Sequence, residues 1–86
     1  MSHIIIRIQR KPEDLEEVIK GLGFEQKTPD RWSYQGRIAL NECHSDINGE
    51  KEYVIMMFHS ITDDRTKADF ERISKILADK YEKKRD

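Results

Sequence analysis

The sequence predicts a small α+β domain, a two-layer sandwich in which an antiparallel-rich sheet of four or five strands carries two helices mainly on one face. Three observations predict it. Apolar residues alternate at a period of two in several short runs, they recur at a helical period in two others, and an Asn-Gly pair separates the two longest strand-like runs. The expected order is β-α-β-β-β-(β)-α, in a single domain that spans residues 1–86.

The first strand and the first helix are predicted before Gly23. Residues 3–9 read H-I-I-I-R-I-Q, and the alternate isoleucines share one face, as a strand requires. Pro12 fits the first turn of a helix, where a missing N–H costs nothing. Gly23 is suited to end that helix in a left-handed conformation. Between them lies an apolar stripe at helical spacing, formed by Leu15, Val18, Ile19 and Leu22.

A short hairpin is predicted next, around Thr28-Pro29-Asp30. Proline followed by aspartate fits a type I turn between residues 24–27 and 31–35. Gly36 then marks either a bulge within one long strand or a turn between two strands. Residues 31–44 are therefore expected to form one strand or two.

The Asn48-Gly49 pair predicts a second hairpin, between residues 37–45 and 51–59. Both faces of the later strand are apolar, which is typical of a central strand that is covered on both sides. With a two-residue turn, the expected partners are Ile47 with Glu50, Cys43 with Val54, Asn41 with Met56, Ala39 with Phe58, Leu40 with Met57 and Ile38 with His59.

A second, longer helix is predicted after Thr62. Thr62 is a suitable N-cap, and Asp63 and Asp64 favour the positive end of the helix dipole. The stripe expected to be buried consists of Phe70, Ile73, Leu77 and Tyr81.

The composition excludes several classes of function. Lys and Arg number 16 and Asp and Glu 17, so a net charge of -1 provides no global positive field for sequence-independent nucleic-acid binding. The single cysteine cannot form an internal disulfide, and the first residues lack the layout of a signal peptide, which predicts a cytoplasmic protein. The longest apolar run, residues 54–58, is far shorter than the ~20 residues that cross a bilayer. No membrane association is expected.

A polar segment that includes Glu42, Cys43, His44 and Asp46 is the first candidate for chemistry. It lacks the C-x-x-C or H-x-x-x-H spacing of a zinc site, and neither a metal nor another cofactor is expected. Glu42 and His44 share a strand face, so they are candidates for a catalytic acid-base pair in a small enzyme. Because no nucleophile motif or glycine-rich phosphate loop accompanies them, the sequence favours a protein without catalytic activity.

Residues 31–37 form the second candidate site. Trp32 and Tyr34 share a strand face, with Arg31 and Arg37 close by, and aromatic residues beside arginines can stack single-stranded bases and neutralise phosphates. Single-stranded nucleic-acid binding is therefore an alternative function, although the net charge does not support it. For Trp32 itself, burial in the core is the favoured interpretation, because aromatic side chains dominate the burial of small domains.

The third candidate is a whole face of the sheet. If both helices cover one face, the other face exposes more apolar surface than a monomer usually presents to water. The residues expected there are Ile5, Val54, Met56 and Phe58, with Trp32 or Tyr34 as possible additions. The sequence therefore predicts a non-catalytic binding or regulatory module that acts through this face, as a homodimer or with another protein partner.

Overall fold

The computed structural model describes residues 2–47, 49–60 and 62–82. Within these ranges the chain forms a five-stranded antiparallel sheet and two helices, so the predicted α+β class is confirmed. In chain order, the elements are β1 (Ser2–Ile8), α1 (Leu15–Gly21), β2 (Glu25–Thr28), β3 (Arg31–Tyr34), β4 (Ile38–Ile47), β5 (Glu50–His59) and α2 (Asp64–Tyr81).

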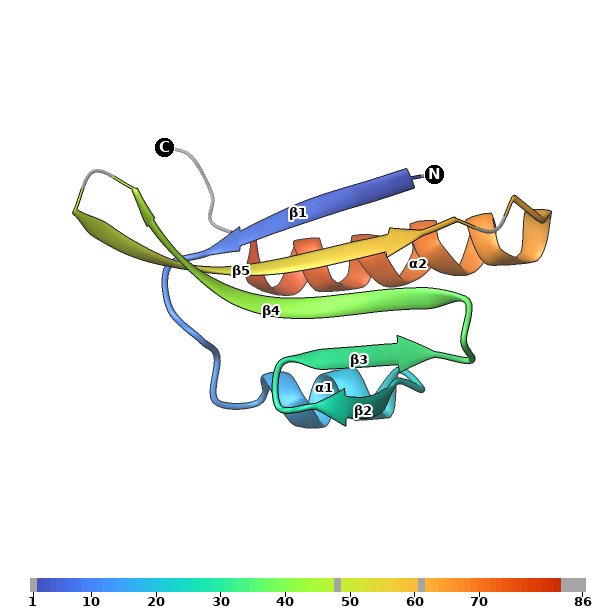
Figure 1. Ribbon diagram of the computed structural model, residues 1–86, viewed down its shortest axis with the longest axis horizontal. Coiled ribbons are helices and arrows are strands. Elements are labelled where there is room, and N and C mark those ends of the chain that lie inside the picture. The colour runs from blue at the N-terminus through green and yellow to red at the C-terminus, as the bar shows by residue number, and fades with distance from the viewer. Residues whose placement is uncertain (1, 48, 61, 83–86) are drawn as a thin grey trace.

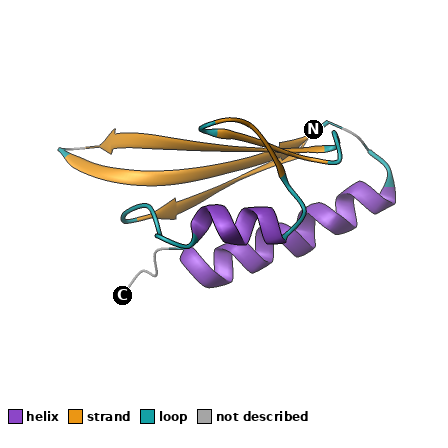
Figure 2. Cartoon of the chain, turned by 90° about the horizontal axis from the view of Figure 1, so that it is seen from below, coloured by secondary structure: helices purple, strands orange, loops and turns teal. Residues whose placement is uncertain are grey.

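The strands lie in the order β1-β5-β4-β3-β2 (Figure 1). All four neighbouring pairs are antiparallel. The chain thus starts at one edge of the sheet, crosses to the other edge through α1, and returns strand by strand until β5 lies beside β1. This arrangement places β5 between β4 and β1 as an inner strand. The sequence indicated that both apolar faces of this strand are covered, whereas the helices cover only one of them (Figure 2).

The register of the β4–β5 hairpin is the predicted one. Pairing runs from Ala39 opposite Phe58 to Ile47 opposite Glu50, with Cys43 opposite Val54 between them. Asn48, the first residue of the expected turn, lies outside the described residues. Because the side-chain period of a strand is two, this register also fixes which residues of both strands share a face.

Gly36 belongs to a turn between two strands, which answers the question that the sequence left open. Gln35 and Gly36 both have a positive φ, at 52° and 69°. The N–H of Arg37 donates to the carbonyl of Tyr34 at 2.9 Å, which closes a tight turn around Gln35 and Gly36 within the connection from β3 to β4. Residues 31–44 are therefore divided between β3 and β4.

Both helices begin later than the sequence predicted. Helix α1 starts at Leu15 and not at Pro12, because the Pro12 carbonyl accepts from the Leu15 N–H at 3.3 Å in a separate turn. The N-cap of α2 is Asp63 and not Thr62. The Asp63 carboxylate accepts from the Thr66 N–H at 2.7 Å, and a carboxylate is favoured over a hydroxyl at the positive end of the helix dipole.

Both helices pack on the same side of the sheet (Figure 2), as the sequence predicted. We call this side of the sheet the covered face and the opposite side the open face. Leu15 and Ile19 of α1, and Phe70, Ile73 and Leu77 of α2, are buried against the covered face. The largest fully buried strand residues beneath them are Ile6, Trp32, Ile38, Leu40, Ile55 and Met57.

Candidate functional site

The open face brings together the four residues that the sequence assigned to it. Ile5 lies opposite Met56, and β5 places Val54 and Phe58 on the same side as Met56. Ile5 is 45% exposed, Met56 and Phe58 are half-buried, and Val54 is buried at 7%. Their β4 neighbours on this face are Ala39, Asn41 and Cys43. The exposed apolar surface is therefore contributed mainly by Ile5, Met56 and Phe58.

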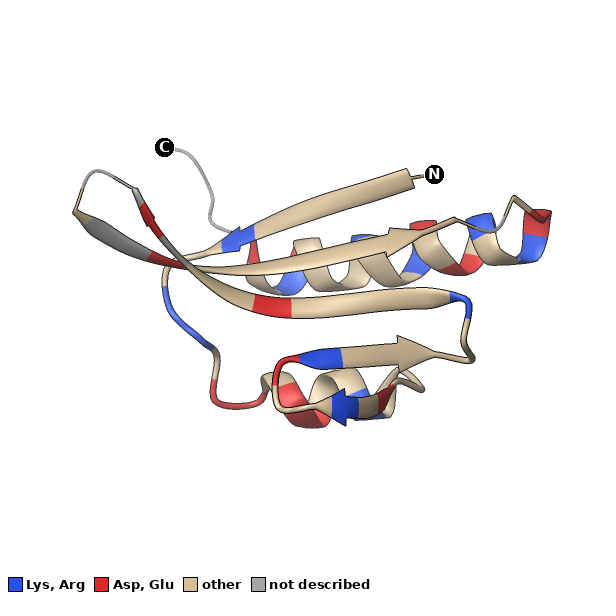
Figure 3. Ribbon diagram, viewed as in Figure 1, with Lys and Arg blue, Asp and Glu red and all other residues tan. Residues whose placement is uncertain are grey.

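Charge on the open face lies away from Ile5, Met56 and Phe58, at the end of the β1–β5 pair and at Arg31 on β3. Arg7 and Glu52, near one end of the β1–β5 pair, form an ion pair at 3.7 Å. Figure 3 shows β5 without charged positions over its central length, whereas Lys, Arg, Asp and Glu are frequent on the helices. The centre of the face thus presents neutral side chains with charges of both signs around it.

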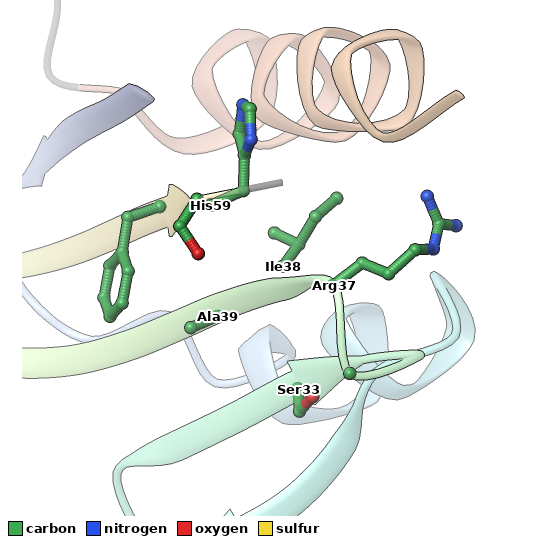
Figure 4. A pocket seen from close by; sticks show the side chains of 8 residues that line it. Ser33, Arg37, Ile38, Ala39 and His59 are labelled. Atoms are coloured by element: carbon green, nitrogen blue, oxygen red, sulfur yellow. The ribbon is translucent and has the colours of Figure 1, made fainter. Parts of the chain in front are cut away.

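A pocket of about 260 Å³ lies at the end of this face, where β4 begins and β5 ends (Figure 4). Its lining includes Ser33, Ala39 and Phe58. Because the side chains of Ser33 and Ala39 are small, a hollow remains beside the Phe58 ring. Arg37 also lines the pocket, but its guanidinium donates to Thr66 Oγ1 at 2.8 Å and to Asp69 at 2.7 Å. Arg37 therefore holds the β3–β4 turn against α2.

The covered face contains a buried carboxylate, Glu42. Trp32 Nε1 donates to Glu42 Oε2 at 2.6 Å, and the Tyr53 hydroxyl donates to Glu42 Oε1. Burial, together with the hydrogen bond to Glu42, raises the pKa of Tyr53 above its ordinary value, so the phenol keeps its proton and remains a donor. Two neutral donors from the neighbouring strands thus hold the carboxylate in place.

Lys11 is the cation nearest to this carboxylate. It lies on the connection between β1 and α1, and its Nζ is 3.5 Å from Glu42 Oε1 and 3.3 Å from Glu16 Oε1. Although burial acts to lower the pKa of Lys11, the hydrogen bond with Glu16 and the charge of Glu42 raise it. The lysine side chain is 43% exposed, whereas that of Glu42 is 4% exposed. The cation therefore stands between solvent and a buried anion.

A pocket of about 550 Å³ opens beside this cluster. It lies where β4 and β5 meet the β1–α1 connection and the β2–β3 turn. Its lining residues are Lys11, Pro29, Asp30, Glu42, Cys43, His44 and Tyr53.

Glu42 and His44 line the same pocket, but the structure does not arrange them as an acid-base pair. The Glu42 carboxylate accepts from Trp32 and Tyr53, while the exposed His44 ring contacts the edge of Tyr53 at a centroid distance of 5.2 Å. Among the described hydrogen bonds, none joins the carboxylate to the imidazole. The buried carboxylate is thus engaged by other donors and does not orient the histidine.

The four residues proposed for nucleic-acid binding do not share a surface. Trp32 is 1% exposed and lies under the helices, as the core interpretation predicted, so neither it nor Tyr34 extends the open face. Tyr34 packs on Phe24 with ring centroids 5.4 Å apart. Arg31 is on the opposite face of β3, and Arg37 is bound to α2. Stacking of a base on Trp32 would require opening of the core.

In the part of the chain that the structure describes, no three His, Cys, Asp or Glu side chains are grouped so that they could share a metal ion. Neither described helix is long and apolar enough to cross a membrane. Comparisons with protein-family models, curated proteins and solved structures find no match to this chain.

Sequence reasoning missed the cluster around Glu42. The predicted hairpin register placed Glu42 on the same face as Leu40 and diagonal to Tyr53, so a core-facing carboxylate with a phenol in reach was readable from the pattern. The contact between Glu42 and Trp32 could not be predicted from the sequence, because it depends on how β3 pairs with β4. A charged residue at a core-facing strand position is the signal that identifies such a site.

Proposed function

We propose that this protein is a non-catalytic binding or regulatory module that self-associates through the open face of its sheet. The observation that carries the proposal is the position of both helices on one side, which leaves Ile5, Met56 and Phe58 exposed or half-buried together. Apolar surface gathered in one place on a domain of this size favours association, because each partner removes the other's surface from water.

The size of the face suits a second copy of the chain. The two longest extents of the molecule are 39 and 25 Å, and Figure 1 looks along the shortest axis onto the sheet. This outline is large enough for the ~800 Å² of accessible surface that each partner contributes to a standard interface.

The charge distribution also favours a second copy over a strongly charged partner. In a two-fold dimer the same face meets itself, so any net charge at its centre would be repelled by its own image. Here the central residues are neutral, and the charged residues lie around them, with Arg7 and Glu52 of opposite sign in one ion pair and Arg31 on β3. We place the dimer in the cytoplasm, where Cys43, which lies on the open face, remains a thiol.

The proposal is tested by charging the face at its most exposed apolar residue. Ile5→Lys should weaken the wild-type dimer by at least about tenfold in Kd, because the interface would have to bury an ammonium group. Ile76→Lys is the matched control, since among the side chains that the structure describes Ile76 is the other exposed large apolar residue, at 39%, and lies on α2. Sedimentation equilibrium at micromolar concentrations measures the dimer Kd of the wild type and of both variants.

Two results would contradict the proposal. One is a wild-type protein that sediments as a monomer at every concentration tested. The other is an equal loss of association in Ile5→Lys and Ile76→Lys, which would place the contact elsewhere. Circular dichroism spectra of the variants establish that both retain the fold.

A further inference from the structure

The buried carboxylate of Glu42 is not explained by the stability of the fold. Taking a carboxylate out of water is costly, and a well-packed apolar residue commonly replaces a buried ion pair without loss of stability. Trp32 and Tyr53 are neutral donors, so they orient the carboxylate and leave its negative charge uncompensated. The charge at this position therefore requires a nearby cation.

Lys11 supplies that cation in the structure, but nothing fixes it rigidly. Its side chain is 43% exposed, it lies outside the helices and strands, and its ammonium is shared between Glu16 and Glu42. Its ion pair with Glu16 joins two partly exposed side chains and contributes little free energy. Lys11 can thus be exchanged for another cation, but not for a neutral group, whereas Trp32 and Tyr53 are held by their strands.

We propose that the pocket beside Glu42 is a binding site for an alkylammonium group, which replaces the ammonium of Lys11 at the Glu42 carboxylate. A cavity of about 550 Å³ accommodates such a group together with several methylene groups. The Pro29 ring and the Tyr53 ring provide walls for the aliphatic chain, as apolar surfaces do for the stem of a lysine. The carboxylate of this site lies on the covered face, away from Ile5, Met56 and Phe58 of the proposed dimer surface, although the lining also includes Cys43 of the open face.

Other classes of ligand fit less well. An anion would meet the carboxylates of Glu42 and Asp30, which both line the pocket. A neutral ligand that displaced Lys11 would leave the buried charge unpaired. The described residues offer no group of three metal-ligating side chains here. An ammonium group is the ligand group that restores the ion pair that Lys11 makes with Glu42.

The test uses n-butylammonium chloride as the probe and the fluorescence of Trp32 as the signal. Trp32 is the single tryptophan of the chain, and its indole N–H is bonded to the carboxylate that the probe would contact. At constant ionic strength, the wild-type protein should show a saturable change in emission. Lys11→Ala should bind about two- to fivefold more tightly, the factor that a partly exposed internal ion pair represents.

Lys20→Ala provides the matched control, because Lys20 lies in the last turn of α1 and does not line the pocket. Its affinity for the probe should equal that of the wild type. Glu42→Gln should abolish the response while retaining hydrogen-bonding groups for Trp32 and Tyr53. If Glu42→Gln does not fold, the affinities of the wild type and Lys11→Ala for n-butylammonium decide by themselves whether the probe replaces Lys11.

Two further ligands define what the site recognises. n-Butanol, which has the same chain without the charge, should give no saturable change. An acetylated and amidated Gly-Lys-Gly peptide that binds more tightly than n-butylammonium assigns the site to a lysine side chain of a partner, and equal affinity assigns it to free amines. The proposal is overturned if neither wild type nor Lys11→Ala responds saturably to n-butylammonium, or if n-butanol gives the same response.

Discussion

At the scale of single residues, Trp32 and Glu42 depend on each other. The indole N–H donates to a carboxylate oxygen at 2.6 Å, and both side chains are buried. A hydrogen bond to an ionised group contributes about twice as much as one between neutral groups. The two groups therefore satisfy each other, and each member without the other leaves a buried polar group with one partner fewer.

A double-mutant cycle measures this dependence. Trp32→Phe should lower the free energy of unfolding by about 1–3 kcal/mol beyond the loss of ring volume, because Glu42 loses a donor. In a Glu42→Leu background the same change should cost less, with a coupling free energy of about 0.5–3 kcal/mol. Urea unfolding followed by far-UV circular dichroism gives both values, since the variants with Trp32→Phe lack the fluorophore. Additive effects would show that the bond contributes nothing to stability.

At the scale of elements, the end of α1 sets the direction in which the chain enters the sheet. The N–H of Phe24 donates to the Ile19 carbonyl at 3.3 Å and that of Gly23 to the Lys20 carbonyl at 3.0 Å, the two bonds of a Schellman motif. Gly23 has a φ of +107°, as expected for the glycine that the sequence placed at the helix end. A Cβ at this position would lie 3.0 Å from the Tyr34 ring.

Alanine at the two glycines of this segment should have opposite effects. Gly23→Ala should destabilise the protein by at least about 1 kcal/mol, because it combines a left-handed backbone with a close contact to Tyr34. Gly21→Ala should stabilise it by about 0.4–1 kcal/mol, since Gly21 is helical and a Cβ there meets nothing within 4 Å. Urea unfolding measures the free energy of unfolding of both variants and of the wild type. Equal effects of the two substitutions would contradict this account of the motif.

At the scale of the whole molecule, sequence patterns predicted the sheet better than the site. The β4–β5 register followed from the Asn-Gly turn and from alternation, because a shift of one residue would have exposed Leu40 and Met57. The start of α1 was mispredicted because a separate turn at Pro12 competes with the helix for the same residues. The position of Lys11 beside Glu42 depends on the path of the connection between β1 and α1, and no local sequence pattern specifies that path.

The arrangement of the strands also offers a second route to association, through an edge. Strand β1 is an outer strand of the sheet, and alternate residues of an antiparallel strand direct their N–H and C=O groups away from the neighbouring strand. Two β1 edges could pair and extend the sheet across two molecules. Arg7 is a charged residue of the type that discourages such pairing.

Hydrogen exchange resolved by residue distinguishes the two routes, which Ile5→Lys alone does not because Ile5 belongs to both surfaces. In a dimer formed through the open face, the outward-directed amides of β1 should exchange at the same rate at low and high protein concentration, since their edge stays in water. The methyl resonances of Ile5 and Met56 should shift over the same range of concentration. Protection of alternate β1 amides that rises with concentration would instead assign the contact to the edge, because only strand pairing occupies those N–H groups.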